Sequence, residues 1–331
     1  MLGTATKVKA AKKVKVRKKK KKPTGFRLAI IDLGTNSVRF DVYRMSGRQA
    51  VRTYRDKTMI RLGDGVFKTG RLSPQGMQRA VHAFLGYRKL MRELRVDQVV
   101  AFGTSALRSS KNASQFIKLI ESKSGIRVRI ISGKEEGSLI AKGILSNIVP
   151  PKGVYALVDI GGGSTEVSLC RGQKILACHS LKLGANRLQQ MFFKTIPPTF
   201  KKGQLHPVLA LRQHLKTELL SIAKLNDKYD IRLAIGSSGT IRSLSRILKK
   251  IGRSSQVINR VDLTSLTAEL QTMTRAELAA IPGLEPKRVD LILTGAILLE
   301  EIMFALGVRY VAVTEFSLRD GILQNELEFR A

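Results

Sequence analysis

Tryptophan is absent from the 331-residue chain, and only two of its residues are cysteines. Cys170 and Cys178 form no CxxC pattern, so they predict neither a disulfide framework nor a zinc site. A reducing compartment is expected, and the protein is predicted to be cytoplasmic. No apolar run reaches the roughly 18 residues that span a bilayer, and no apolar segment follows the charged N-terminus as in a signal peptide. The sequence therefore predicts no membrane association.

Residues that build several common kinds of site are also scarce. The four histidines show no HxH or HExxH spacing, and no nucleophile–base pair can be argued from them. Aromatic residues make up 5% of the chain, which weakens an interpretation based on stacking of nucleic-acid bases. No glycine-rich stretch has the P-loop pattern GxxxxGK[ST], or GxGxxG after the first strand. These patterns give no evidence for a zinc enzyme or a common nucleotide-binding motif.

Acidic residues are few in comparison with basic ones. The chain has 59 Lys and Arg against 25 Asp and Glu, a formal net charge of +34. Residues 7–22, KVKAAKKVKVRKKKKK, hold eleven of these cations and no acid, so self-repulsion predicts a disordered tail over residues 1–25. The remainder keeps 48 cations, a net charge of +23, and such a field attracts polyanions. The lysines of the tail could bind nucleic acid or polyphosphate equally well. For the folded part, the plainer alternative is that its positive charge serves solubility alone.

Strands and helices mix through the rest of the chain, which predicts an α/β protein. A Pro-Pro break at 150–151 separates two series of elements. We predict a first domain over 26–140 and a second over 141–331, whose last helix could pack back on the first. The predicted strands are 26–32, 37–44, 127–132, 154–160, 164–170, 232–236 and 309–317, and 98–108 is predicted as a strand that runs into a small-residue turn. The predicted helices are 73–94, 112–124, 133–147, a stretch over 262–305 and a short C-terminal one.

An internal repeat joins the two predicted domains. DLGTNS at 32–37 recurs as DIGGGS at 159–164, and each copy follows an apolar strand. Glycines allow a close backbone approach, and successive N–H groups form a concave anion site. One such turn alone is more simply a tight hairpin with a solvated Asp. Two copies, with a third glycine turn GSSGT at 236–240, favour phosphate binding.

The candidate site residues follow from these turns and from GTS at 103–105, where ordinary turn chemistry is the alternative. Asp32 and Asp159 end buried strands and are candidate ligands for Mg²⁺ or Mn²⁺, hard cations that prefer carboxylate and water oxygens. Such a cation relieves the repulsion between a phosphoryl group and an oxygen nucleophile. The predicted phosphate-binding residues are Gly34, Thr35, Asn36, Ser37, Thr104, Ser105, Gly161, Gly162, Gly163, Ser164, Gly236, Ser238, Gly239 and Thr240.

Together these turns resemble the actin/hexokinase/heat-shock-ATPase superfamily, in which two related domains clamp a phosphate chain. More specifically, eight blocks between about residues 26 and 325 resemble the Ppx/GppA phosphatases, exopolyphosphatases and guanosine pentaphosphate phosphohydrolases. The blocks are AIIDLGTNSVR, IRLGDGV, FGTSALRSSKN, IISGKEEG, VDIGGGSTEV, LGANRL, IGSSGTIRSL and RVDLILTGAILL. The chain departs mildly at GSSGT, where GASGT is common, and at FSLRDG, where YGLRDG is common. The resemblance implies two actin/ribonuclease-H-like domains with a cleft between them, in the short form.

The same resemblance implies roles for the charged residues. Glu136 matches the proposed general base, Glu166 an acid that supports the attacking water or the metal, and Arg108 an arginine that contacts phosphate. Asp159 and Asp32 match the metal-linked acids of the two domains. Members of that family often look dimeric, so the resemblance also implies a homodimer.

Local chemistry separates the two adjacent acids of KEEG. The spacing of Ser132 and Glu135 predicts a capping box, which gives Glu135 a structural role. Glu136 is alternatively a solvated first-turn acid, and there the helix dipole lowers its pKa. A role as base therefore requires burial or a like charge to raise that pKa. Strand alternation places Glu166 on the same side as Ser164.

These observations predict a Mg²⁺-dependent exopolyphosphatase in which water, activated by Glu136, attacks the terminal phosphorus. The basic folded part favours inorganic polyphosphate over pppGpp, the alternative substrate, which would connect the protein to the stringent response. Two other classes remain open from the residues: a kinase or ATPase of the same superfamily, and a polyanion-binding protein that uses the basic tail.

Overall fold

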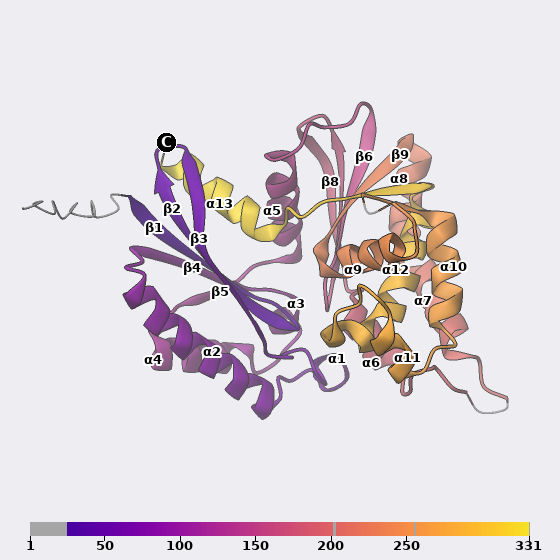
Figure 1. Ribbon diagram of the computed structural model, residues 1–331, viewed down its shortest axis with the longest axis horizontal. Helices are drawn as coiled ribbons and strands as arrows, with labels where there is room; N and C mark the ends of the chain where they lie inside the picture. The colour runs from indigo at the N-terminus through magenta and orange to yellow at the C-terminus, as the bar shows by residue number, and fades with distance from the viewer. Residues whose placement is uncertain (1–24, 201–202, 255, 331) are drawn as a thin grey trace, which may run out of the picture.

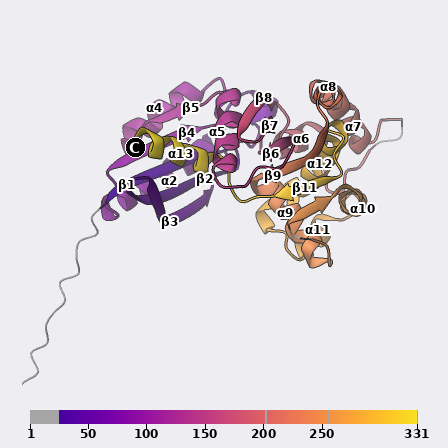
Figure 2. The ribbon, with the colours of Figure 1, turned by 90° about the horizontal axis from the view of Figure 1, so that it is seen from above.

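The structure, a computed structural model, describes residues 25–200, 203–254 and 256–330. The predicted disordered tail lies outside the described residues except for Gly25. Two lobes, each built around one sheet, lie side by side (Figures 1 and 2). The predicted α/β class with two related domains is confirmed. No helix in the described part of the chain is long and apolar enough to cross a membrane.

The first lobe contains a five-stranded sheet in the order β3-β2-β1-β4-β5. Its first three strands are antiparallel neighbours, and β4 and β5 run parallel to β1. The edge strand β3 is absent from the sequence prediction, because its charged residues show no clean alternation. The strands are β1 (Phe26–Leu33), β2 (Ser37–Ser46), β3 (Gln49–Met59), β4 (Gln98–Gly103) and β5 (Val128–Ile130).

The second lobe repeats this topology and adds one edge strand, in the order β10-β11-β9-β6-β7-β8. Strand β6 takes the place of β1. On one side, β7 is antiparallel to β6 and β8 is antiparallel to β7; on the other side, β9 and β11 run parallel to β6. The sequence repeat therefore marks a repeat of the whole sheet. The strands are β6 (Val154–Ile160), β7 (Thr165–Arg171), β8 (Lys174–Leu181), β9 (Ile231–Ser237), β10 (Val257–Asn259) and β11 (Tyr310–Val313).

Helices cover both faces of the first sheet. Ser73 caps α2 by accepting the Gly76 N–H at 3.1 Å, and Pro74 occupies the first helical position, as predicted. Helices α2 and α4 bury one side of β1 through Ala29 and Ile31. The helices of this lobe are α1 (Val66–Thr69), α2 (Pro74–Glu93), α3 (Ser105–Arg108), α4 (Ala113–Ser124) and α5 (Gly133–Leu145).

The second lobe holds the largest core, with α12 almost wholly buried in it. The predicted helical stretch over 262–305 is broken, because Thr274 starts a new helix with a capping box and Gly283 adopts a φ of 92°. The predicted strand over 309–317 ends at Val313. The elements are α6 (Ala185–Phe192), α7 (Pro207–Glu218), α8 (Leu220–Lys228), α9 (Ser238–Lys250), α10 (Arg260–Leu270), α11 (Arg275–Ala280), the 3₁₀ helix η1 (Pro286–Leu291) and α12 (Ile292–Ala305).

The last helix, α13 (Leu318–Phe329), leaves the second lobe and packs on α5 and the first sheet (Figure 1). Leu28 of β1 and Leu157 of β6 belong to one core with Ile144 of α5 and Ile322 of α13. Helices α5 and α13 thus share a core with the facing sides of both sheets. The predicted domain boundary at residue 140 lies inside α5, so it divides a single packed helix.

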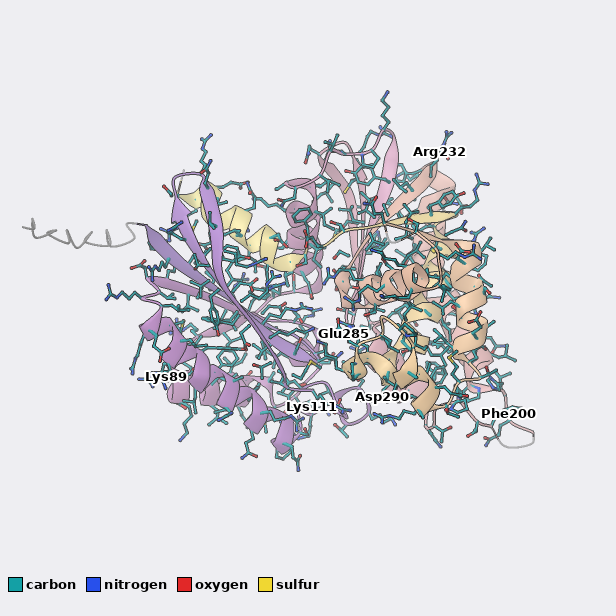
Figure 3. All side chains as sticks on the ribbon, viewed as in Figure 1. Lys89, Lys111, Phe200, Arg232, Glu285 and Asp290 are labelled. Carbon is teal, nitrogen blue, oxygen red and sulfur yellow. The ribbon has the colours of Figure 1, made fainter. Side chains whose placement is uncertain are left out.

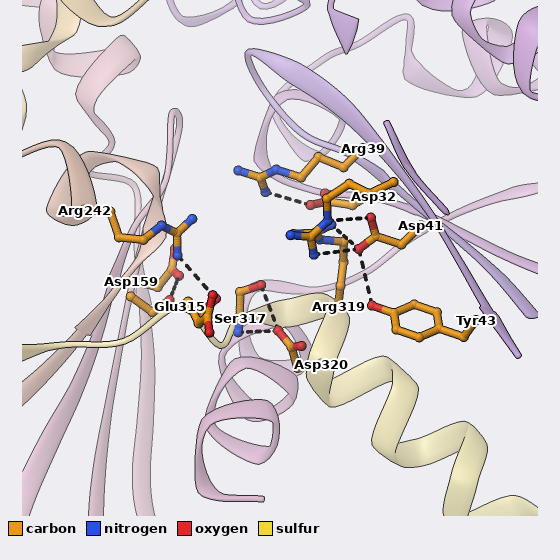
Figure 4. Close-up of polar contacts among 12 residues, drawn as sticks. Asp32, Arg39, Asp41, Tyr43, Asp159, Arg242, Glu315, Ser317, Arg319 and Asp320 are labelled. Carbon is orange, nitrogen blue, oxygen red and sulfur yellow. Dashed lines mark hydrogen bonds and ion pairs between the residues drawn. The ribbon is translucent and has the colours of Figure 1, made fainter. Parts of the chain in front are cut away.

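A buried ion pair fixes α13 to the first sheet. Arg319, 8% exposed, donates to Asp41 of β2, which is fully buried (Figure 4). Arg55 also donates to both oxygens of Asp41, at 3.0 and 3.1 Å, and Tyr43 donates at 3.3 Å. The carboxylate therefore satisfies two cations, and its loss would leave Arg319 buried without a partner.

Asp41→Ala should lower the free energy of unfolding by about 3 kcal/mol, the cost of breaking a buried pair from one side. Chemical denaturation monitored by circular dichroism measures it. Asp230→Ala makes the same change in the exposed pair with Arg232 and should leave the midpoint where it is. Equal midpoints for the two variants would show that the Asp41 network does not hold the helix.

Candidate active site

The two repeated turns have the same backbone closure. The Gly34 N–H donates to the Ser37 carbonyl at 3.1 Å, and the Gly161 N–H donates to the Ser164 carbonyl at 2.9 Å. The two turns also touch each other across the lobes, since a Cβ placed on Gly162 would lie 2.8 Å from the Thr35 Cβ. The glycines are therefore required for the contact between the lobes.

Two strand-to-helix corners complete the surroundings of the turns. Thr104 and Ser105 follow β4, and Ser238 begins α9 directly after β9. Ser238 has a φ of 91°, a region that costs a non-glycine residue energy and is typical of functional turns. Because α9 has thirteen residues, its free N–H groups and dipole favour an anion at this end.

One cleft brings together most of the predicted residues. Glu166, Arg108 and Gly236 are not among the residues that line it, and a Cβ on Gly236 would meet Val311 and Ile241 at 2.7 and 2.9 Å. The placement of Gly236 therefore indicates a packing role rather than phosphate binding. The predicted residues that line the cleft are Asp32, Gly34, Thr35, Asn36, Ser37, Thr104, Ser105, Glu136, Asp159, Gly161, Gly162, Gly163, Ser164, Ser238, Gly239 and Thr240.

Two glutamates lie on either side of one arginine. The Arg108 Nη1 is 2.6 Å from the Glu136 Oε2, and its Nη2 is 4.0 Å from the Glu166 Oε1. The Nη2 also donates to the Ser164 hydroxyl at 3.3 Å. Ser180 of β8 donates to the Glu166 Oε1 at 2.8 Å, so both carboxylates are held in place.

Burial changes the acidity of both glutamates, which are 8% and 3% exposed. It raises the pKa of Glu136 to about 7, against the opposing charge and hydrogen bond of Arg108, and Asp159 and Asp32 raise it further. Burial also raises the pKa of Glu166, and the charge of Glu136 adds to that increase. A base at Glu136 requires burial that offsets the lowering of its pKa by the helix dipole. Glu136 is buried in this way.

The adjacent acid Glu135 differs from its prediction in one respect. Ser132 accepts the Glu135 N–H at 3.1 Å, as expected of a cap. The Glu135 carboxylate does not return to the Ser132 N–H, however, but binds Arg129 through both oxygens at 2.6 and 2.9 Å. The predicted capping box is therefore only half formed, because an ion pair with β5 takes the carboxylate.

The two aspartates occupy equivalent ends of β1 and β6. Asp32 accepts from Arg39 at 3.0 Å, and Asp159 accepts from Ser237. At the position of Ser237, the Ppx/GppA phosphatases that the chain resembles commonly have alanine. Burial raises the pKa of Asp159, and the charge of Asp32 contributes in the same direction. In the described residues, no three His, Cys, Asp or Glu side chains gather around a single point. This donor set fits Mg²⁺, which uses one or two carboxylates together with water and substrate phosphate, and does not fit a protein-only metal cage.

Three arginines of the cleft were missed by the sequence prediction. Arg39 follows Ser37 on the same side of β2, and Arg242 lies one helical turn after Ser238. These periodicities could have identified both. Arg288 of η1 reaches the cleft from a segment 126 residues after Gly162, and no local pattern connects the two.

Helix α6 closes the cleft at the side of the turns and explains the block LGANRL. Asn186 donates to the Asn36 side chain at 2.7 Å, and Gln190 donates to the Gly63 carbonyl at 2.9 Å. The Arg187 guanidinium lies 4.1 Å from the ring centroid of Phe67. These contacts join the second lobe to the first.

Two sheets of equal topology, with paired glycine turns facing one cleft, define a two-domain protein of the actin-like class. Within that class, the chain belongs to the Ppx/GppA phosphatase family, whose model matches residues 42–329. Exopolyphosphatase 2 of Mycobacterium tuberculosis is 30% identical over 318 residues, which cover 89% of this chain and 97% of that protein.

Solved structures agree with this assignment. An exopolyphosphatase from Cytophaga hutchinsonii has a TM-score of 0.82 at 25% identity, over 92% of this chain and 98% of that one. The Aquifex aeolicus member of the Ppx/GppA family has a TM-score of 0.73 at 25% identity, with the same coverage of both chains. The chain is therefore a phosphoanhydride hydrolase.

Gly162→Ala should lower the rate of phosphate release at least about tenfold, because the new methyl group displaces Thr35 and the facing turn. Overpacking of this kind costs about 1–3 kcal/mol, so the variant should still fold. Phosphate release and thermal denaturation measure the two effects. Gly86→Ala, in α2 with nothing near its Cβ position, is the control and should keep full activity. An unchanged rate in Gly162→Ala would contradict the conclusion that activity requires the two turns to approach this closely.

Proposed function

We propose that the protein is a Mg²⁺-dependent exopolyphosphatase that releases the terminal orthophosphate of inorganic polyphosphate. The observation that carries this proposal is the buried Glu136 carboxylate, which lines the cleft together with both phosphate turns. A carboxylate with a pKa near 7 can both accept a proton at neutral pH and release it afterwards. No histidine lines the cleft in the described part of the chain to compete for this role.

In the proposed reaction, the terminal phosphoryl group lies between the turns of β1–β2 and β6–β7. A water molecule next to Glu136 attacks the phosphorus as the carboxylate takes its proton. The bond from the phosphorus to the bridging oxygen breaks, and the shortened chain leaves with the electron pair. Backbone N–H groups of the turns and the start of α9 stabilise the charge on the phosphoryl oxygens.

The neighbours of Glu136 have supporting roles in this scheme. Arg108 holds the Glu136 carboxylate at 2.6 Å and presents its other nitrogen to Ser164, at the end of the phosphate turn. Glu166 orients the water or the metal ligand sphere. Asp32 and Asp159 would hold Mg²⁺, and the bound cation would neutralise phosphate charge that otherwise repels the nucleophile.

The charge of the cleft favours a polyanionic chain as the substrate. Arg39, Arg242 and Arg288 line the cleft beyond the turns, and each repeating unit of polyphosphate offers them the same anionic oxygens. The guanosine of pppGpp would bring one nucleoside in place of further phosphates. We therefore rank pppGpp second, as the alternative substrate for the same chemistry.

A panel of long-chain polyphosphate, pppGpp and ATP, each with Mg²⁺ and with a chelator, tests substrate and metal together. Phosphate release should be fastest from polyphosphate, and the chelator should abolish it because the cleft would lose the charge that offsets phosphate repulsion. Release from pppGpp but not from polyphosphate would reverse the substrate order. Full activity in the chelator would remove the metal from the proposal.

Glu136→Gln should reduce turnover by about 10²–10⁴-fold, since the amide cannot accept the proton of the attacking water. Binding of polyphosphate should persist, because the phosphate turns are unchanged. The matched control is Glu135→Gln, which alters the neighbouring exposed acid paired with Arg129 and should keep the rate. Turnover in Glu136→Gln within tenfold of the unmodified protein would exclude Glu136 as the base.

A further inference from the structure

Lys57 of β3 lies outside the set of residues that the reaction uses. The register of the sheet places it directly opposite Arg39 of β2, with both side chains on the same face. Like charges in directly opposed positions destabilise a sheet. Arg39 has Asp32 as its partner, whereas Lys57 forms no ion pair or hydrogen bond with any residue that the structure describes. This arrangement costs stability and calls for an anion from outside the chain.

The second lobe contributes another cation to the cleft that Arg39 lines. Arg288 lines the cleft, and its Nε is buried without a hydrogen-bond partner in the described structure. Its guanidinium lies against Gly239, where a Cβ would come within 1.8 Å of the Nη2. The preceding Lys287 is paired with Glu285 at 2.6 Å, and Glu285 lies on the side of the second lobe that faces the first (Figure 3).

Electrostatics connect these groups across the two lobes. Desolvation of the ammonium group lowers the pKa of Lys57 to about 7, and the charges of Arg39, Arg288 and Lys287 lower it further. Burial likewise lowers the pKa of Arg288 to about 10. Glu285 is the acid that opposes this excess, and it is already shared by Lys287 and Arg246. Arg39, Arg288 and Lys287 thus act on Lys57 as like charges, while Asp32 and Glu285, the carboxylates near them, are already paired.

We propose that Lys57, together with Arg39 and Arg288, forms an outer anion subsite that binds an internal phosphate of the polyphosphate chain. This inference rests on the proposed function and adds a second binding position, in front of the position of the terminal phosphate. Arg39 connects the two positions, because it contacts Asp32 at the end of β1 and stands opposite Lys57 on β3. Since Arg288 belongs to the other lobe, an anion bound here would hold the lobes together.

The subsite makes a prediction about chain length. A long chain reaches Lys57 while its end lies at the turns, whereas orthophosphate fills only the inner position. Loss of one charge-assisted contact should raise the dissociation constant of the long chain about tenfold and leave that of orthophosphate unchanged.

The test compares Lys57→Met with Lys57→Arg and with Lys89→Met, which removes an exposed lysine of α2 far from the cleft (Figure 3). Direct binding of long-chain polyphosphate and of orthophosphate is measured by calorimetry on the full chain, and KM and kcat are measured alongside. Lys57→Met should weaken long-chain binding about tenfold and raise KM with little change in kcat. Lys57→Arg should restore binding, and Lys89→Met should match the unmodified protein.

Unchanged long-chain binding in Lys57→Met would overturn the subsite, and so would equal weakening for orthophosphate. A loss that Lys57→Arg does not restore would also overturn it, since a lost strand contact rather than a lost charge would then be the cause. The proposed function fails in a different way: the unmodified protein would bind polyphosphate without releasing phosphate from it. Binding and turnover, measured on the same samples, separate the two failures.

Discussion

The contact between the two glycine turns is the constraint on which the rest of the site depends. Gly162 lies so close to Thr35 that a single methyl group would not fit between them. Because each turn ends the central strand of its own sheet, this contact places the carboxylates of Asp32 and Asp159 at the same cleft. The glycines of the turns therefore set the distance between the lobes.

Two further connections hold that arrangement. Helix α6 binds the first lobe through Asn186 and Arg187, beside the turns. Helix α13 crosses from the second lobe and is fixed to β2 by Arg319 and Asp41 (Figure 4). The cleft is thus bounded by one contact made at the turns and another made by the C-terminal helix. Leu318, next to Arg319, lines the cleft itself, so the anchor of α13 and the wall of the site are adjacent residues.

The distribution of charge within the cleft explains its chemistry. Burial raises the pKa of Glu136 and Asp159, which line the cleft, and of Glu166, which lies beside Arg108. Arg39, Arg242 and Arg288 line the same cleft and would lower the cost of bringing in a phosphate chain. A cleft that combines arginines with buried carboxylates is suited to an anionic substrate and to the proposed attack by water activated at an acid.

Much of this was predictable from local sequence, because the turns use glycine, serine and aspartate in a repeated pattern. The repeat of DxGxxS predicted two related domains, and alternation predicted the side of Glu166. Arg288 was missed because no local pattern connects it to the turns, and such a cation resembles an ordinary solvated residue until its surroundings are known. The predicted strand over 309–317 was too long, because it includes the crossing to α13, which no local pattern distinguishes from a strand.

The sequence by itself determined the class of fold, the family, and the turns and acids that belong to the site. These depend on residue types and short spacings, which can be read directly from the sequence. Only the tertiary structure decided that Glu136 is buried beside Arg108, that Gly236 serves packing, and that Lys57 stands opposite an arginine that lines the cleft together with Arg288. Burial and charge proximity arise from residues far apart in the chain, and both depend on how the two lobes and α13 pack together.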